Sequence, residues 1–435
     1  MKYYKIYREL QKHLNSMPIG FPASINKNAD IRLLKHIFTP EEAKIACFLT
    51  YKPETLAAIF EKIDIWQNEQ QRDDANINII IKSPEHLATI LDKIQKKGGI
   101  ESKIKDGVRY YCNSPLVVGI YELQVNRLTP KFLEDFSRYN HDINFGLEFL
   151  SLKKPQMRVI PIQKSITPTH RVSHFDEVST LFEKASSPFV VLDCICRKKS
   201  KMEGEPCKIT SRKETCLAVG NAATTSILMG IGREISRDEA ISIIEQNQKD
   251  GLVLQPSNTE ELDFICSCCG CCCGMLSVHQ KLPIPIEFWS SNFYVAIDSD
   301  LCNGCGICSK RCQVGGVTIS NYSLDKKSLD SRVKTTSKKA VVDLNICIGC
   351  GLCVPTCPKK AITLVKKQEE IKPPLNREEL YDIIMADKKH GIAAFDTLKD
   401  TSIKESLNKL KVVGKLARGM LKTGKIELLR NSQSK

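Results

Sequence analysis

Apolar residues in the first third of the chain recur at helical spacing, between polar residues that begin and end helices. The run Thr39-Pro40-Glu41-Glu42 is a capping box in front of one apolar stretch, and Ser83-Pro84 begins another. A further helix is expected from Pro53 to Ile63. Apolar runs at 100–104 and 108–112 flank Lys105-Asp106-Gly107, which predicts a β-hairpin. Three helices followed by two strands predict a winged-helix-like domain.

Many winged helices bind DNA, so the outward face of the third helix, residues 84–97, bears on function. No Arg, Asn or Gln stands at the start of this helix to contact a base edge, and two carboxylates would face phosphate. The residues expected on this face are Glu85, His86, Thr89, Asp92, Lys93 and Lys96. We therefore expect docking or packing here rather than nucleic-acid binding. The isolated Cys47 and Cys112 are expected to be core thiols.

Eight cysteines toward the C-terminal end form an internal repeat with the spacing C-x2-C-x2-C-x3-C. In this pattern three thiolates hold one [4Fe–4S] cluster and the fourth ligates the neighbouring cluster. The first predicted cluster is held by Cys302, Cys305, Cys308 and Cys357. The second is held by Cys347, Cys350, Cys353 and Cys312. Zinc sites use four ligands each and give no reason for such a repeat.

The sequence around this repeat predicts its local structure. Tight turns that aim N–H groups at sulfur are expected at Gly304, Gly306, Gly349 and Gly351. Apolar runs at 294–297 and 339–343 predict a strand before each half. Gln313 stands where a proline usually follows the fourth cysteine, and the polar insert 321–338 is expected to be a solvated loop.

Ten further cysteines occupy the middle of the chain. A strand-like run at 189–192 leads to Cys194 and Cys196, which should share one face of the strand and reach one metal together. Cations follow them, at Arg197, Lys198, Lys199 and Lys201; positive charge lowers a thiol pKa and offsets the charge of a cluster. The other cysteines are Cys207, Cys216, Cys266, Cys268, Cys269, Cys271, Cys272 and Cys273.

Ten thiols exceed any packing need, so metal binding is expected in this region. Adjacent residues of an extended segment point to opposite faces, so Cys268 and Cys269 should not face the same metal. We predict at least a third cluster, held by Cys194, Cys196, Cys207 and Cys216 with thiols from the segment 266–273. A fourth cluster, a structural zinc and a redox-active disulfide are the alternatives.

Composition narrows the class of protein. The 20 cysteines of the 435 residues are clustered, and no signal-peptide pattern opens the chain, which argues against a secreted disulfide protein. We expect a reducing compartment, the cytoplasm of an anaerobic cell, and no transmembrane segment. Half of the net charge of +14 lies in residues 401–435. This helical basic tail is expected to dock on an acidic partner or a membrane surface, or to be solvated.

Motifs along most of the chain, from about residue 17 to about residue 390, carry a resemblance. They are Gly20-Phe21-Pro22, Ile37-Phe38-Thr39-Pro40-Glu41-Glu42-Ala43, Val118-Gly119-Ile120-Tyr121-Glu122, Asp193-Cys194-Ile195-Cys196-Arg197, Cys268-Cys269-Gly270-Cys271-Cys272 and Ser291-Asn292-Phe293. Together with the cysteine repeat, they resemble the large 4Fe-4S dicluster-domain ferredoxin-like proteins of anaerobic bacteria. The resemblance implies cluster binding and electron transfer.

The expected fold class is α+β multidomain. Its expected parts are a lead-in (1–30), a winged-helix-like domain (31–125), a helical connection (126–160), a Cys-rich α/β domain (161–290), a two-[4Fe-4S] ferredoxin-like domain (291–367) and a helical basic tail (368–435).

Electron transfer between a protein donor and a protein acceptor is the expected function. The chain lacks the G-x-G-x-x-G and G-x4-G-K-[ST] nucleotide motifs and any flavin module. It is therefore expected to be an electron carrier or oxidoreductase subunit rather than a stand-alone enzyme. The alternatives are a redox-sensing DNA-binding regulator and an oxidoreductase subunit with a catalytic cluster in its middle domain.

Overall fold

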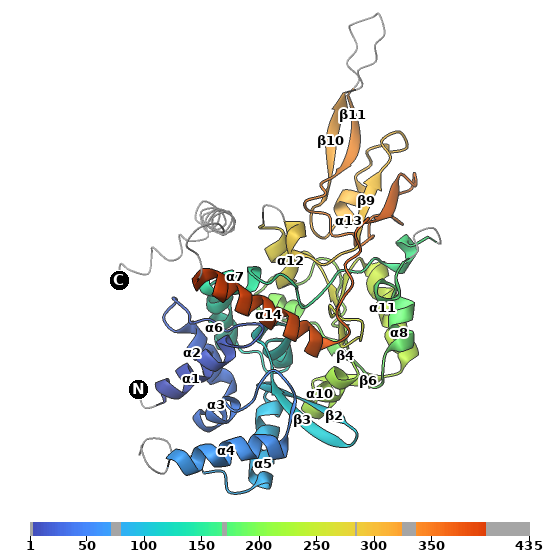
Figure 1. The fold of residues 1–435 in the computed structure, drawn as a ribbon. Coiled ribbons are helices and arrows are strands. Elements are labelled where there is room, and N and C mark those ends of the chain that lie inside the picture. Colours follow the sequence, from blue (N-terminus) through green and yellow to red (C-terminus); the bar gives the residue numbers. More distant parts are fainter. Residues whose placement is uncertain (1–2, 71–79, 168–171, 283–284, 324–335, 397–435) are drawn as a thin grey trace, which may run out of the picture.

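The computed structural model describes residues 3–70, 80–167, 172–282, 285–323 and 336–396 (Figure 1). No helix within these ranges is both long enough and apolar enough to cross a membrane. The basic tail predicted at 401–435 lies outside the described residues, as does the centre of the polar insert, 324–335.

Helices of the N-terminal part pack around a large apolar core. They are α1 (Tyr4–Asn15), α2 (Ala29–Ile37), α3 (Pro40–Ala46), α4 (Leu56–Gln70), α5 (Pro84–Lys96), α6 (Pro130–Asn140) and α7 (Ile143–Leu150). The predicted capping box is confirmed, since the Thr39 N–H donates to Glu42 Oε2 at 2.7 Å and the Glu42 N–H donates to Thr39 Oγ1. Helix α4 begins at Leu56, because the residues before it form the short strand β1 (Glu54–Thr55).

The predicted hairpin is also present. Strands β2 (Ile100–Lys105) and β3 (Val108–Asn113) pair antiparallel, and β1 adds to β3, giving the order β1-β3-β2. Irregular turns at Leu116–Ile120 and Glu122–Gln124 then lead to α6. The α5 face that was expected to point outward includes Asp92, which pairs with Arg109 of β3 at 2.8 Å. The winged-helix class of this region stays a prediction.

A five-stranded sheet forms the middle of the chain, in the order β6-β4-β5-β8-β7. Its strands are β4 (Phe189–Asp193), β5 (Glu214–Val219), β6 (Gly232–Ile235), β7 (Val253–Pro256) and β8 (Phe264–Cys268), and its helices are α8 (Val178–Lys184), α9 (Ile195–Met202), α10 (Asn221–Met229), α11 (Arg237–Asp250) and α12 (Gly274–His279). All pairings of these five strands are antiparallel. The α/β arrangement expected here is therefore wrong, because α/β folds rest on parallel strands.

The cysteine repeat lies in the segments that connect the strands of two small antiparallel ribbons, which project from the rest of the molecule (Figure 1). One pairs β9 (Phe293–Ile297) with β12 (Ile362–Lys366), and the other pairs β10 (Val317–Ser323) with β11 (Thr336–Val342). Between β9 and β10 lies the short helix α13 (Ile307–Arg311). Both ends of the polar insert belong to the β10–β11 ribbon, so the expected loop is shorter than 321–338.

Long-range contacts hold these parts together. Arg158 is buried and donates to the carbonyls of Phe175, Ser257 and Thr259, while its own N–H donates to the Pro256 carbonyl. Helix α14 (Arg377–Asp396) runs back from the ribbons to the N-terminal helices (Figure 1). There Arg377 pairs with Glu101 of β2 at 2.6 Å. Arg158 thus connects the segment before the middle sheet to residues of that region, and α14 connects the ribbons to the N-terminal region.

Candidate iron–sulfur sites

Four thiols of the repeat share one pocket, which we call the distal thiol group. Its members are Cys302, Cys305, Cys308 and Cys357, and the pocket is also lined by apolar residues of β9, β11 and β12. Backbone N–H groups aim at the sulfurs: those of Gly304 and Ala340 lie 3.4 Å from Cys302 Sγ, and that of Ala361 lies 3.3 Å from Cys357 Sγ. Such N–H donors stabilise the negative charge of cluster-bound thiolates.

The other four thiols form the proximal thiol group, Cys312, Cys347, Cys350 and Cys353. Burial and, after it, the nearby Cys312 thiolate raise the pKa of Cys350 to about 12. Burial also raises the pKa of Cys347 and Cys353, and both again face Cys312. Hydrogen bonds from the Gly349 and Val295 N–H groups oppose the shift at Cys347. The distal and proximal groups contain the same residues as the two sets that the spacing predicts.

Positive φ angles are found at the four ligand-loop glycines, as predicted, with Gly304 at 72° and Gly349 at 64°. Two of these glycines also lie against another strand. A Cβ on Gly304 would approach the Lys338 carbonyl oxygen to 2.1 Å, and a Cβ on Gly349 would approach that of Phe293 to 2.1 Å. The loops therefore need glycine for both conformation and space.

Replacing Gly349 by alanine is expected to remove about four irons per chain, because the ligand loop must move away from β9. Gly315 is a matched control, since its φ is 77° but nothing lies within 4 Å of the Cβ position. Gly315→Ala is expected to destabilise by only about 1 kcal/mol and to retain all iron. Iron analysis and thermal unfolding check this, and equal iron contents in the two variants would contradict it.

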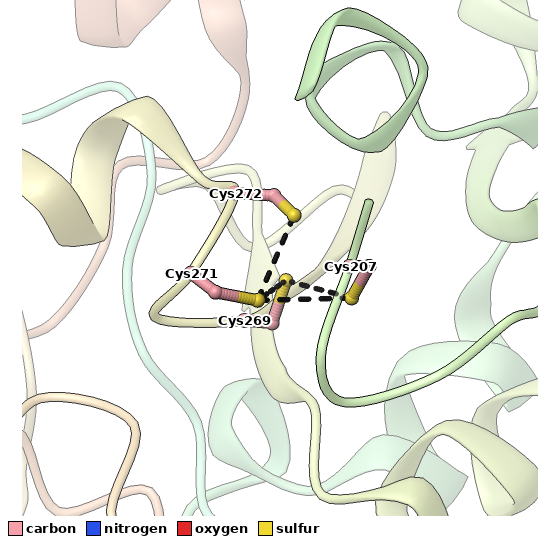
Figure 2. A group of neighbouring side chains, drawn as sticks. All are labelled: Cys207, Cys269, Cys271 and Cys272. Carbon is pink, nitrogen blue, oxygen red and sulfur yellow. Dashed lines mark hydrogen bonds between the residues drawn. The ribbon is translucent and has the colours of Figure 1, made fainter. Parts of the chain in front are cut away.

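Four of the middle cysteines meet at the surface in what we call the four-thiol group, shown in Figure 2. It consists of Cys207, Cys269, Cys271 and Cys272, whose sulfurs all lie within 4.8 Å of one another. Cys269 is buried and Cys271 is exposed. Burial alone would raise the pKa of Cys207, but N–H donors from Thr210 and Ile209 lower it to about 7. Contacts of 3.6 to 3.8 Å between these sulfurs match the corners of a single tetrahedral metal site. An iron–sulfur cube takes the same four thiolates with the sulfurs farther apart.

The remaining six middle cysteines form a closed ring of contacts, the six-thiol group. Cys194 lies near Cys196 and Cys216, and these thiols shift one another's pKa. Cys266 likewise lies near Cys216 and Cys268, and Cys273 lies near Cys196 and Cys268. Cys268 and its neighbour Cys269 thus belong to different groups, as the alternation of an extended segment predicts.

Two expectations about this region are corrected. Cys207 was grouped with Cys194, Cys196 and Cys216, but it lies in the four-thiol group. Strand β4 ends at Asp193 after an irregularity in its pairing, and Cys194 then caps helix α9. Cys194 and Cys196 therefore meet across the first turn of a helix and not on one face of a strand.

The charges around the first cysteine pair also differ from the expectation. Arg197 is buried, 6% exposed, and donates to Thr215 Oγ1 and, at 2.7 Å, to the Ser267 carbonyl. Lys198 instead donates to Asn126, Lys199 pairs with Glu203, and Lys201 is exposed. In the sequence Arg197 is one of four neighbouring cations, and only the fold shows that it is the buried one.

Gln313 has a role that sequence reasoning missed. Its side-chain Oε1 accepts from the Gly270 N–H at 2.9 Å, and its carbonyl accepts from Gln280 at 3.1 Å. Gly270 precedes Cys271 of the four-thiol group, while Gln313 follows Cys312 of the proximal group. The sign of this role in the sequence is that Gln313 stands where a proline usually follows the fourth cysteine. Cys47 and Cys112 belong to none of the thiol groups; the Cys47 thiol donates to the Ala43 carbonyl, and Cys112 is buried.

Comparison with known proteins identifies the ribbon region. The family model described as "4Fe-4S dicluster domain" matches residues 301–361. These residues are a 4Fe-4S dicluster domain. The distal and proximal thiol groups lie within this domain, which binds 4Fe-4S clusters. No curated protein and no solved structure matches the chain.

The dicluster domain does not stand apart from the middle region. Ile348 and Leu352 of its ligand loops share one apolar core with Cys268, Leu276 and other middle residues. The Ile162 N–H donates to the Cys350 carbonyl at 3.1 Å, and Arg311 donates to carbonyls at the end of α11. The proximal group therefore lies on the side of the domain that faces the middle region.

Proposed function

We propose that the chain passes electrons between protein partners through two [4Fe–4S] clusters of its dicluster domain and a third cluster at the four-thiol group. The observation that carries this proposal is the partition of the eight repeat cysteines. Cys312 lies with the second half of the repeat, and Cys357 lies in the pocket of the first half. This crossover is the ligation pattern of paired clusters in electron-transfer ferredoxins.

The placement of the three groups supports a relay. The distal pocket lies on the projecting ribbons, the proximal group faces the middle region, and Gln313 connects the proximal group to the four-thiol loop. Cys271 is exposed and Cys305 is exposed, so each end of this series is open to a protein partner. We place the protein in a reducing compartment, the cytoplasm, because free thiolates and clusters require one.

Reductive titration of the anaerobically purified full chain tests the proposal. Three clusters correspond to about twelve irons and about three electrons per chain, since each cube takes up one electron. Electron paramagnetic resonance should resolve signals from interacting clusters. A chain with eight irons or fewer, or with zinc on Cys271 and its partners, would contradict the third cluster. A chain that binds clusters but takes up no electrons would contradict electron transfer.

Replacing Gln313 tests the connection. Gln313→Leu removes the acceptor of the Gly270 N–H and is expected to destabilise the chain by about 1 kcal/mol. Iron content should not change, but electron exchange between the four-thiol and proximal clusters should slow several-fold. Gln313→Glu keeps an acceptor oxygen at similar length and serves as the control. Rapid-mixing reduction with viologen radical measures both rates, and equal rates would contradict a role for this contact.

A further inference from the structure

We infer that the six-thiol group binds an iron–sulfur cluster of its own, separate from the cluster proposed at the four-thiol group. The inference goes beyond the three clusters proposed above. The six thiols come from segments that are far apart in the sequence. Cys194 and Cys196 lie at the start of α9, Cys216 lies on β5, Cys266 and Cys268 lie on β8, and Cys273 precedes α12.

Four separate elements thus bring six thiols to one point inside the protein. All six are free cysteines, so no disulfide accounts for their proximity. A cysteine packs as a small apolar side chain, and some of the six do contact apolar cores, but packing alone gives no reason for six thiols to gather at one point. A shared metal centre is the chemistry that explains such convergence.

Arg197 provides an independent observation at the same place. Its guanidinium is buried, and its Nε has no hydrogen-bond partner among the residues that the structure describes. It donates to Thr215 Oγ1, beside Cys216, and to the carbonyl of Ser267, which stands between Cys266 and Cys268. A buried guanidinium needs a compensating negative charge. A thiolate-ligated cluster supplies that charge, and its sulfides accept hydrogen bonds from buried N–H donors.

The two middle groups are distinct sites. Cys271 forms hydrogen bonds with Cys207, Cys269 and Cys272 in one group. In the other group Cys194, Cys266 and Cys273 interact with their neighbours in the ring. Arg197 donates to Thr215 and to Ser267, beside members of the six-thiol group. A single cube spanning both would have to leave most of the ten thiols unligated.

The number of thiols also bears on the metal. A single zinc takes four thiolates and two zincs can share six, so zinc is analysed together with iron. One iron–sulfur cube takes four of the six thiols. The group is placed for relay, because Cys196 packs against the N-terminal core and Cys268 and Cys273 share a core with the dicluster domain.

Iron and sulfide analysis of the full chain, reconstituted anaerobically, tests the inference. With four clusters the wild-type protein should bind about sixteen irons per chain. Cys271→Ser should remove about four of them, Cys268→Ser at least about four, and the double variant the sum of the two losses. Cys112→Ser, a buried cysteine outside both groups, is the control and should remove none.

A wild-type count of about twelve irons would overturn the inference while leaving the third cluster in place, whereas eight or fewer would overturn both. The wild-type count decides even if Cys268→Ser fails to fold. A double variant that loses no more iron than one single variant would mean a single shared site. Zinc in place of iron on wild-type protein would also overturn the inference.

Discussion

Anaerobic removal of iron and sulfide is expected to unfold the chain between about residue 157 and residue 366 and to leave the N-terminal helices folded. The cysteines of the middle and dicluster regions are themselves core residues. Cys268 and Cys273 are buried in the core shared by the two regions, and Cys308, Cys347 and Cys353 in the core of the ribbons. Without metal these thiols lose the bonds that join the segments carrying them, and metal-binding free energy is lost from the folded state.

The N-terminal core has a different composition, which is why it should survive. Its buried members are apolar residues, nearly all of them from residues 6–149, and none of those described is a cysteine; Cys47 and Cys196 only pack against it. Hydrogen–deuterium exchange on the metal-free protein measures the outcome. Amides of α1 to α6 should keep their protection, while those of β4, β5, β8 and the ribbons should lose it. Equal protection in the metal-free and metal-bound forms would contradict the expectation.

Local signals predicted much of this structure. The capping box at Thr39, the hairpin around Gly107 and the tight ligand loops at Gly304 and Gly349 are each determined by a few neighbouring residues. The spacing of the repeat gives the same two sets of four thiols that lie near one another in the structure. That these sets ligate two cubes stays a prediction.

The middle region could not be predicted in the same way. Its two thiol groups depend on sheet pairing between distant segments, such as Leu217 of β5 opposite Ile265 of β8. That register brings Cys216 next to Cys266, whereas Cys207 lies in the four-thiol group. The end of β4 at Asp193 and the return of α14 to Glu101 are likewise results of tertiary packing. No periodicity in a single segment encodes them.

The two sites of the dicluster domain are expected to differ sharply in their effect on stability. Cys305→Ala should remove about four irons and lower the free energy of unfolding less than Cys350→Ala does, because Cys305 is exposed at the distal pocket. Cys350→Ala should also remove about four irons but destabilise by more than about 4 kcal/mol, as loss of a buried metal site does.

The physical reason is the packing around Cys350. Its carbonyl accepts the Ile162 N–H, and its neighbours Ile348 and Leu352 lie in the core shared with the middle region. Loss of the proximal cluster should therefore disturb Gln313 and, through Gly270, the four-thiol group. Denaturant unfolding and iron analysis of both variants measure this. If Cys305→Ala destabilised the chain as much as Cys350→Ala, the proximal site would not be the structural connection between the two regions.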